Sequence, residues 1–252
     1  MKYFKVIVLL FIFLCVGGCN NSSKNDYNTM ILSSNNEGYN YSVSSEENEE
    51  LLKANVVVYN HNYNSFLGIK LKKHNTYGSG FVFKEDSNNY YVLTNNHVVS
   101  PDYSFNNNEI FIEDYYGNKY EGKVINRSSE YDLAIVKFSK EIELNVLEIV
   151  SDDSVIGEKV KSMGNPSSTK NVINDGKVSC YSIVNINNER SNIQFDVLVH
   201  SAVIKNGSSG SALLNEENEV IGVTFAGVFD KDENFITGYA IPASKINEFL
   251  SK

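Results

Sequence analysis

The chain has 252 residues, of which 42% are hydrophobic and 21% charged, and its formal net charge is −9 at pH 7. That length is enough for one large all-β unit or for two small domains that share a site. Because an acidic surface repels the phosphate backbone of nucleic acids, the charge argues against DNA or RNA as a partner.

The first residues have the pattern of an export signal. Lys2 and Lys5 precede an apolar run, Val6 to Val16, that is shorter than the apolar stretch a transmembrane helix needs. The following Val16-Gly17-Gly18-Cys19 resembles a bacterial lipobox, in which the chain is cut before the cysteine and the cysteine is lipidated. We therefore expect residues 1–18 to be a lipoprotein signal peptide and Cys19 to anchor the protein on the outer side of a bacterial cell membrane. The alternative is an ordinary secretory signal with an incidental cysteine.

Residues 19–50 are rich in Asn and Ser and end in an acidic run from Glu46 to Glu50. Such a segment offers little apolar area for burial, which predicts a disordered tether. A helix that starts within Ser45 to Glu50 and leads into Leu51 and Leu52 is the alternative for its last residues, and it is compatible with a tether before it.

Cysteine usage predicts a fold without disulfides. Cys15 leaves with the signal peptide and Cys19 carries lipid, so only Cys180 remains in the globular part. We interpret Cys180 as a small buried apolar side chain.

The globular part is expected to consist of short strands. Runs rich in Val, Ile, Tyr and Phe recur between Gly, Asn and Asp residues, and they are Asn55 to Tyr59, Gly80 to Phe83, Tyr90 to Thr94, Glu109 to Glu113, Leu133 to Phe138, Lys159 to Met163, Ile193 to Val199, Ala212 to Leu214, Val220 to Phe225 and Gly238 to Ile241. Helical periodicity appears only at Ala243 to Leu250, which predicts a short C-terminal amphipathic helix. This pattern indicates a sandwich or barrel, and the charged stretch Ser139 to Asp153 is the best place for a link between two halves.

Three segments carry the residue types that acyl transfer by serine requires: a hydroxyl nucleophile, a base and backbone donors for the oxyanion. His97 follows an apolar strand, Asp132 stands at the start of another, and Ser209 lies in the turn Asn206 to Ala212 with its flanking glycines. Each signal alone is weak, because a lone His after a strand is more often structural, Asp before a strand is commonly a turn residue, and a Gly/Ser loop is commonly flexible.

Order and spacing strengthen the assignment. The residues occur as His97, Asp132 and Ser209, separated by 35 and 77 positions. That is the order of chymotrypsin rather than the Ser, Asp/Glu, His order of the α/β-hydrolases. No cluster of His, Cys and carboxylate residues has metal-ligand spacing, so we expect no metal and no other cofactor.

Together these segments resemble the chymotrypsin-like or trypsin-like serine proteases of bacteria, especially the protease domain of the HtrA/Deg family and the glutamyl endopeptidase group. The motifs that carry the resemblance are Thr94 to Val99, Asp132 to Lys137, Gly157 to Val160, Met163 to Pro166, Asp175 to Ser179, Gly207 to Ser211, Asn218 to Val223 and Tyr239 to Pro242. The resemblance covers the chain from about Ala54 to its end.

The resemblance implies an all-β fold of two six-stranded Greek-key β-barrels, here residues 51–150 and 151–252, with the active site in the cleft between them and a short C-terminal helix. It implies a serine endopeptidase with His97, Asp132 and Ser209 as the catalytic triad, and an oxyanion hole made by the backbone N–H groups of Gly207 and Ser209. It also implies a substrate-binding wall, which is formed by Val203, Ile204, Lys205, Thr224, Phe225, Ala226 and Gly227. The expected partners are protein or peptide substrates, and the membrane through lipid on Cys19.

The chain also departs from the family. Ser208 replaces the usual Asn or Asp, and Ser211 replaces the second Gly of the nucleophile loop. The chain stops without the PDZ domain of HtrA proteins, so PDZ-directed regulation is not expected. The apolar pocket wall, with Thr224 where glutamyl endopeptidases place a His, predicts small or medium aliphatic residues before the cleaved bond. The alternative function is a catalytically weak binding or adhesion lipoprotein that keeps the protease fold.

Overall fold

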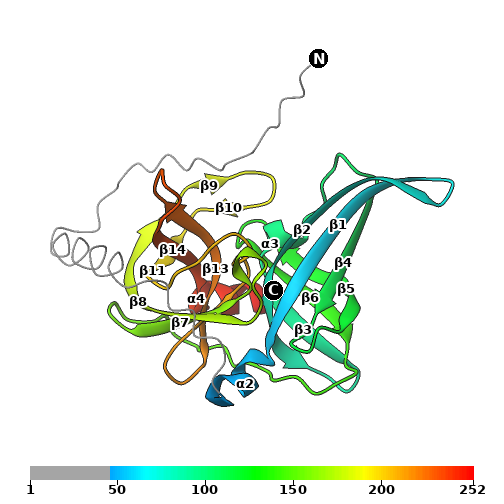
Figure 1. Ribbon diagram of the computed structural model, residues 1–252. Coiled ribbons are helices and arrows are strands. Elements are labelled where there is room, and N and C mark those ends of the chain that lie inside the picture. The colour runs from blue at the N-terminus through cyan, green and yellow to red at the C-terminus, as the bar shows by residue number, and fades with distance from the viewer. Residues whose placement is uncertain (1–45) are drawn as a thin grey trace.

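The computed structural model describes residues 46–252 (Figure 1). The expected signal peptide, Cys19 and residues 19–45 of the expected tether lie outside the described residues. The expectation of an all-β fold with two six-stranded barrels and a short C-terminal helix is confirmed. None of the helices within residues 46–252 is long and apolar enough to span a bilayer.

The first barrel is closed and antiparallel, in the strand order β1-β2-β3-β6-β5-β4. Its strands are β1 (Asn55–Phe66), β2 (Ile69–Glu85), β3 (Asn89–Thr94), β4 (Asn107–Glu113), β5 (Lys119–Ser128) and β6 (Leu133–Ser139). Alternate residues such as Val56, Val58, Tyr90 and Val92 are buried in its interior, as the two-residue side-chain period of strands requires.

The second barrel is closed in the order β11-β14-β13-β12-β7-β8. Its strands are β7 (Lys159–Gly164), β8 (Val172–Ile183), β11 (Asp196–His200), β12 (Ala212–Leu214), β13 (Val220–Phe229) and β14 (Phe235–Pro242), and a separate hairpin of β9 (Ile186–Asn187) and β10 (Asn192–Ile193) lies between β8 and β11 in the chain. Residues 140–158, between β6 and β7, join the two barrels. A further core cluster includes Phe81 and Leu93 of the first barrel and Ile241 and Phe249 of the second half, so the two halves share apolar packing.

Three short α-helices and one 3₁₀ turn complete the described chain: α2 (Glu46–Leu52), α3 (Asn96–Val99), the turn η1 (Pro166–Ser168) and α4 (Ala243–Leu250). Helix α2 is the alternative that the sequence left open for the end of the tether, and its last residues Leu51 and Leu52 are buried. Helix α4 has the bounds that the periodicity predicted, and it buries Ile246 and Phe249.

Two barrel strands were missed by the sequence analysis. Strand β5 is largely exposed and polar, so it lacks the apolar alternation that marks a strand. Strand β8 contains Asp175-Gly176, which is typical of a turn. Gly176 serves another purpose there, because a Cβ at that position would overlap with the backbone of Ala202. Cys180 on β8 was interpreted as a small buried apolar side chain, and it is partly buried against the core.

Several other strand predictions differ from the structure in length. The predicted strand Ile193 to Val199 is interrupted between β10 and β11. Strands β1 and β2 extend far beyond their predicted ends as one hairpin, which projects from the first barrel (Figure 1). Its turn places Leu67 and Gly68 at φ values of 49° and 79°, as tight hairpin turns require.

Candidate active site

Two side chains of the first barrel form a bonded pair. Asp132 is completely buried just before β6, and its Oδ2 lies 2.7 Å from Nδ1 of His97 in α3. Its other oxygen, Oδ1, accepts the backbone N–H of His97 at 2.9 Å. Asp132 has a φ of 50°, which is unusual for a residue other than Gly. Its carbonyl is held by the backbone N–H of Asn96 at 3.1 Å and by the side-chain amide of Asn95 at 2.9 Å.

These contacts fix both the orientation and the basicity of His97, whose side chain is 30% exposed. Burial acts to lower the pKa of His97, but the charge of Asp132 and its hydrogen bond outweigh burial and hold the pKa above the ordinary value of 6.5. The charge of Arg190 acts in the opposite direction. With Nδ1 bonded to Asp132, Nε2 is the ring nitrogen that remains for proton transfer.

The expected nucleophile stands in the turn that leads into β12 of the second barrel. Ser209 Oγ donates to the carbonyl oxygen of Phe225 at 3.4 Å, a long and weak hydrogen bond. Among residues 46–252, no hydrogen bond joins Ser209 to His97.

The backbone around Ser209 has the form of an anion-binding turn. In the described part of the chain, neither Gly207 N nor Ser209 N donates a hydrogen bond. The carbonyls that share their peptide planes are held from behind, because Ser167 N donates to Asn206 O at 2.6 Å and Ser211 N donates to Ser208 O at 2.9 Å. In a trans peptide the C=O and N–H point in opposite directions, so each contact leaves the N–H of Gly207 or Ser209 pointing away from the donor that holds the neighbouring carbonyl.

Ser79 on β2 ties this loop to the first barrel, and the sequence analysis missed it. Its N–H donates to Ser209 O at 2.7 Å, and its Oγ donates to Gly207 O at 2.8 Å. The same Oγ accepts the backbone N–H of Asn165 at 2.8 Å. Thr94 donates to Ser79 O at 2.7 Å. The available signal was the pair of glycines around Ser79, since a Cβ at Gly78 would come within 2.9 Å of Ser209 O.

Both departures from the family loop are buried serines, and within the described residues only the hydroxyl of Ser208 forms a hydrogen bond. Ser208 is buried, and its Oγ accepts the backbone N–H of Lys205 at 3.1 Å. Ser211 is also buried, opposite Gly164 of β7, where any Cβ would overlap with Ser211 Oγ. The extra hydroxymethyl group at position 211 thus occupies the space that a glycine at position 164 leaves.

The expected substrate wall is assembled in part. Ile204 faces Gly227, since a Cβ on Gly227 would lie 2.8 Å from Ile204 Cδ1. Phe225 is buried and stacks on Tyr239 with ring centroids 6.3 Å apart. Thr224 is fully buried, and its hydroxyl has no hydrogen-bond partner within the described residues.

The remaining wall residues are more open. Val203, Lys205, Ala226 and Gly227 are partly exposed. By contrast, the neighbouring His200 is completely buried with its ring against Gly238, and burial lowers its pKa to about 4. His200 therefore packs inside the second barrel as a neutral side chain.

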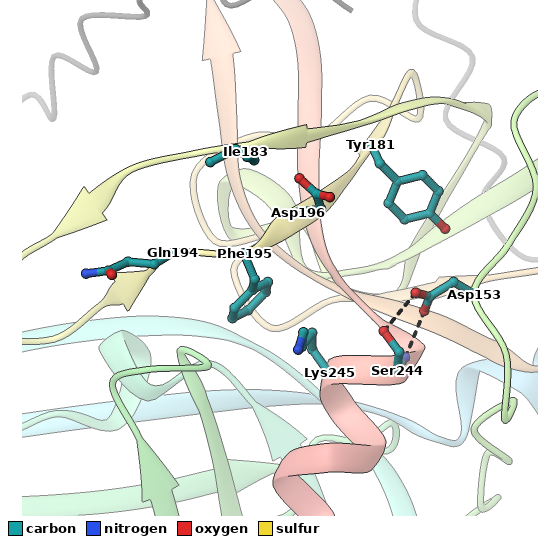
Figure 2. A pocket seen from close by; sticks show the side chains of 8 residues that line it. All are labelled: Asp153, Tyr181, Ile183, Gln194, Phe195, Asp196, Ser244 and Lys245. Atoms are coloured by element: carbon teal, nitrogen blue, oxygen red, sulfur yellow. Dashed lines mark hydrogen bonds between the residues drawn. The ribbon is translucent and has the colours of Figure 1, made fainter.

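A cavity of about 610 Å³ lies away from these residues, among β8, β11 and α4 (Figure 2). It brings a serine close to an acid, because Ser244 N and Oγ donate to the two carboxylate oxygens of Asp153 at 2.8 and 2.7 Å. Both groups are used in holding the first turn of α4, and no histidine lines this cavity. It lacks the base that serine chemistry requires.

Comparison with known proteins agrees with this geometry. A family described as trypsin-like peptidase domain matches residues 78–223, a range that contains His97, Asp132 and Ser209. The chain is 32% identical over 183 residues to a probable periplasmic serine endoprotease DegP-like of Buchnera aphidicola, covering 71% of this chain and 37% of that protein.

Two further relatives give the same picture. The periplasmic serine endoprotease DegP of Salmonella typhimurium is 30% identical over 178 residues, and the serine protease HTRA1 of Xenopus tropicalis is 32% identical over 180 residues. Each alignment covers 69% of this chain and 35% of the relative. The chain thus spans little more than a third of the length of these relatives.

Proposed function

This chain belongs to the trypsin-like peptidase family, and on that premise we propose that it is a serine endopeptidase in which His97, Asp132 and Ser209 form the catalytic triad. The observation that carries the proposal is the pair of hydrogen bonds, at 2.7 and 2.9 Å, by which buried Asp132 holds His97. A structural histidine does not need a buried carboxylate on both its ring and its backbone. Further support comes from the turn that contains Ser209, because the backbone N–H groups of Gly207 and Ser209 donate no hydrogen bond within the described residues.

The mechanism follows from these groups. His97 Nε2 takes the proton of Ser209 as Oγ attacks the peptide carbonyl carbon, and the oxygen that becomes negative is stabilised by the N–H groups of Gly207 and Ser209. The protonated His97 then gives its proton to the leaving amine as the C–N bond breaks. Water repeats the sequence on the acyl-enzyme and restores Ser209. Asp132 stays ionised throughout and stabilises the imidazolium.

Kinetics of single and double variants test this proposal. Ser209→Ala and His97→Ala are each expected to lower kcat by several orders of magnitude, and the double variant by little more, because triad members act as a unit. Ser208→Ala is the matched control, since Ser208 Oγ accepts a hydrogen bond only from the backbone N–H of Lys205. Full activity of Ser209→Ala, together with loss of activity in Ser208→Ala, would refute the nucleophile assignment.

One observation favours a second candidate, a binding or adhesion protein with weak catalysis. Ser209 Oγ is hydrogen-bonded to Phe225 O rather than to His97. If the side chain stayed in this rotamer, no base would activate the serine. Hydrolysis of a casein or peptide-library substrate that disappears in Ser209→Ala would exclude this candidate.

The proposal extends to the location of the protein. The relatives from Buchnera and Salmonella have names that include the word periplasmic, which supports export, and the lipobox at Val16 to Cys19 supports a lipid anchor on the outer side of a bacterial membrane. The full chain is expected to partition into the detergent phase. The Cys19→Ser variant is expected to be released from the membrane or to remain as an unprocessed precursor. Mass spectrometry that finds the mature protein beginning elsewhere with a free amine would contradict the anchor.

A further inference from the structure

A small cavity beside the proposed base is lined by both arginines of the chain. It has a volume of about 190 Å³, and its wall includes Arg127 at the end of β5 and Arg190 in the turn between β9 and β10. The sequence contains no other arginine and has a net charge of −9. Within the described residues, neither guanidinium forms an ion pair or a hydrogen bond. Two arginines without acidic partners in so acidic a chain suggest that a ligand supplies the negative charge.

The cavity is connected directly to the catalytic residues. Asn96, which precedes His97 in α3, donates its side-chain amide to Arg190 O at 2.6 Å. The same turn of the second half is tied to the first barrel where Asn192 N donates to Ser129 O at 2.6 Å. The charge of Arg190 reaches His97 and acts to lower its pKa. A ligand in this cavity therefore lies next to the base.

A further group in the wall identifies the kind of ligand. Asn96 is 4% exposed, and its Oδ1 is a buried acceptor with no hydrogen-bond partner in the described part of the chain. A free carboxylate, sulfate or halide ion has no hydrogen to donate to this oxygen, and the carboxylate of Glu189, which also lines the cavity, repels a free anion. A peptide that carries an acidic side chain offers both a carboxylate for the arginines and an N–H for Asn96.

We propose that this cavity is a substrate subsite for an Asp or Glu side chain close to the cleaved bond, at a position other than the residue that fills the Ile204 and Gly227 pocket. Arg127 and Arg190 bind the carboxylate, and Asn96 Oδ1 accepts a substrate N–H. This inference rests on the proposed function, because it concerns the substrate of the same site.

The test uses peptide substrates that are identical except for Glu or Gln, placed at one position at a time on either side of the cleaved bond. For the unmodified chain, kcat/KM is expected to favour Glu over Gln on the order of 10-fold to 100-fold at one position. Arg190→Gln and Arg127→Gln are expected to bring that ratio close to one, and Arg190→Lys to retain part of it. Lys123→Gln is the matched control, because Lys123 is an exposed cation on β5 outside the cavity.

A Glu/Gln ratio near one at every position, or a preference that survives both arginine-to-glutamine variants, would overturn the subsite. Binding of inorganic phosphate to these arginines, combined with a Glu/Gln ratio of one, would also overturn it and leave a free-anion site. Failure of the proposed function looks different, because the unmodified chain would then cleave none of the peptides. Binding of the Glu and Gln peptides to Ser209→Ala, measured by fluorescence anisotropy, reports on the subsite without turnover, and the Glu peptide is expected to bind more tightly.

Discussion

Ser79 in the first barrel donates its backbone N–H to the carbonyl of Ser209 in the second, at 2.7 Å. The hydroxyl of Ser79 holds the carbonyl of Gly207 in the same way, at 2.8 Å. The turn that carries the proposed nucleophile is therefore attached to the barrel that carries the proposed base. Relative movement of the two halves would change the distance between His97 and Ser209, and these two bonds oppose that movement.

Replacement of Ser79 by Ala is expected to lower kcat by about 10-fold to 100-fold with a smaller change in KM, because Gly207 O loses its donor and the oxyanion turn is held less firmly. Ser162→Ala on β7 is a matched control, since Ser162 is also a buried serine and its strand partner is Leu213, which follows the turn that contains Ser209. Steady-state kinetics with a thermal unfolding measurement separates the two effects. Equal losses of kcat in both variants would show that Ser79 has only a general structural role.

Gly210, next to the proposed nucleophile, is expected to tolerate no side chain. Its φ is 89°, and a Cβ would overlap with Ser79 O and with Thr94 Oγ1. Gly210→Ala should therefore destabilise the fold by several kcal/mol and abolish activity. Gly68→Ala is the control for backbone strain alone, because Gly68 has a φ of 79° and nothing within 4 Å of the new Cβ, so it should cost about 1 kcal/mol. Urea unfolding of both variants checks the difference, and similar values would contradict the packing argument.

The raised pKa of His97 predicts how kcat/KM depends on pH in the acidic range. Only neutral His97 accepts a proton, so kcat/KM should fall as pH drops through a pKa above 6.5. Asp132→Asn removes the charge that raises this pKa, which should move the acid limb to lower pH and lower kcat by about 10⁴-fold. Arg190→Gln removes an opposing charge and should move the limb to higher pH. An acid limb that stays unchanged in both variants would show that His97 is not the titrating base.

The same linkage has a consequence for stability. Because the folded pKa of His97 lies above the ordinary value of 6.5, the contribution of its pair with Asp132 is fully present below that pH and is lost as pH rises through the folded pKa.

Cleavage is expected after small or medium aliphatic residues such as Val, Ala or Leu. Ile204 and Gly227 face each other across the expected pocket, and Phe225 packs beside them on Tyr239. No carboxylate stands among these residues, so Arg or Lys at this position would lose hydration without gaining a partner. One methylene changes apolar discrimination by only about 1–3 kcal/mol, so selectivity should be broad. A cleavage profile dominated by Glu, Arg or Lys at this position would contradict this prediction.

The sequence predicted the parts of this protein that depend on local patterns. Alternating apolar residues predicted strands such as β3 and β6, and periodicity predicted α4 with its bounds. The pattern could not predict β5, because most of its residues are polar and Tyr120 is its only buried side chain. It could not separate β10 from β11 either, since Gln194 and Phe195 continue the alternation across the break.

The candidate site shows the same division. The turn around Ser209 and the strand before His97 have recognisable local sequences. The role of Ser79 depends on contacts with residues up to 130 positions away in the chain, at Ser209 and Gly207. The cavity with Arg127 and Arg190 forms only where the β9–β10 turn meets the first barrel. Neither feature leaves a local signal stronger than a pair of glycines or an isolated arginine.

The most direct measurement is labelling of the folded chain by a fluorophosphonate, followed by peptide mapping, because only a serine activated by a working base reacts readily with this reagent. We predict that Ser209 is the one residue labelled in the unmodified chain. Labelling should be absent in Ser209→Ala, strongly reduced in His97→Ala and normal in Ser208→Ala. An unlabelled chain, or a label on any serine other than Ser209, would contradict the proposed triad.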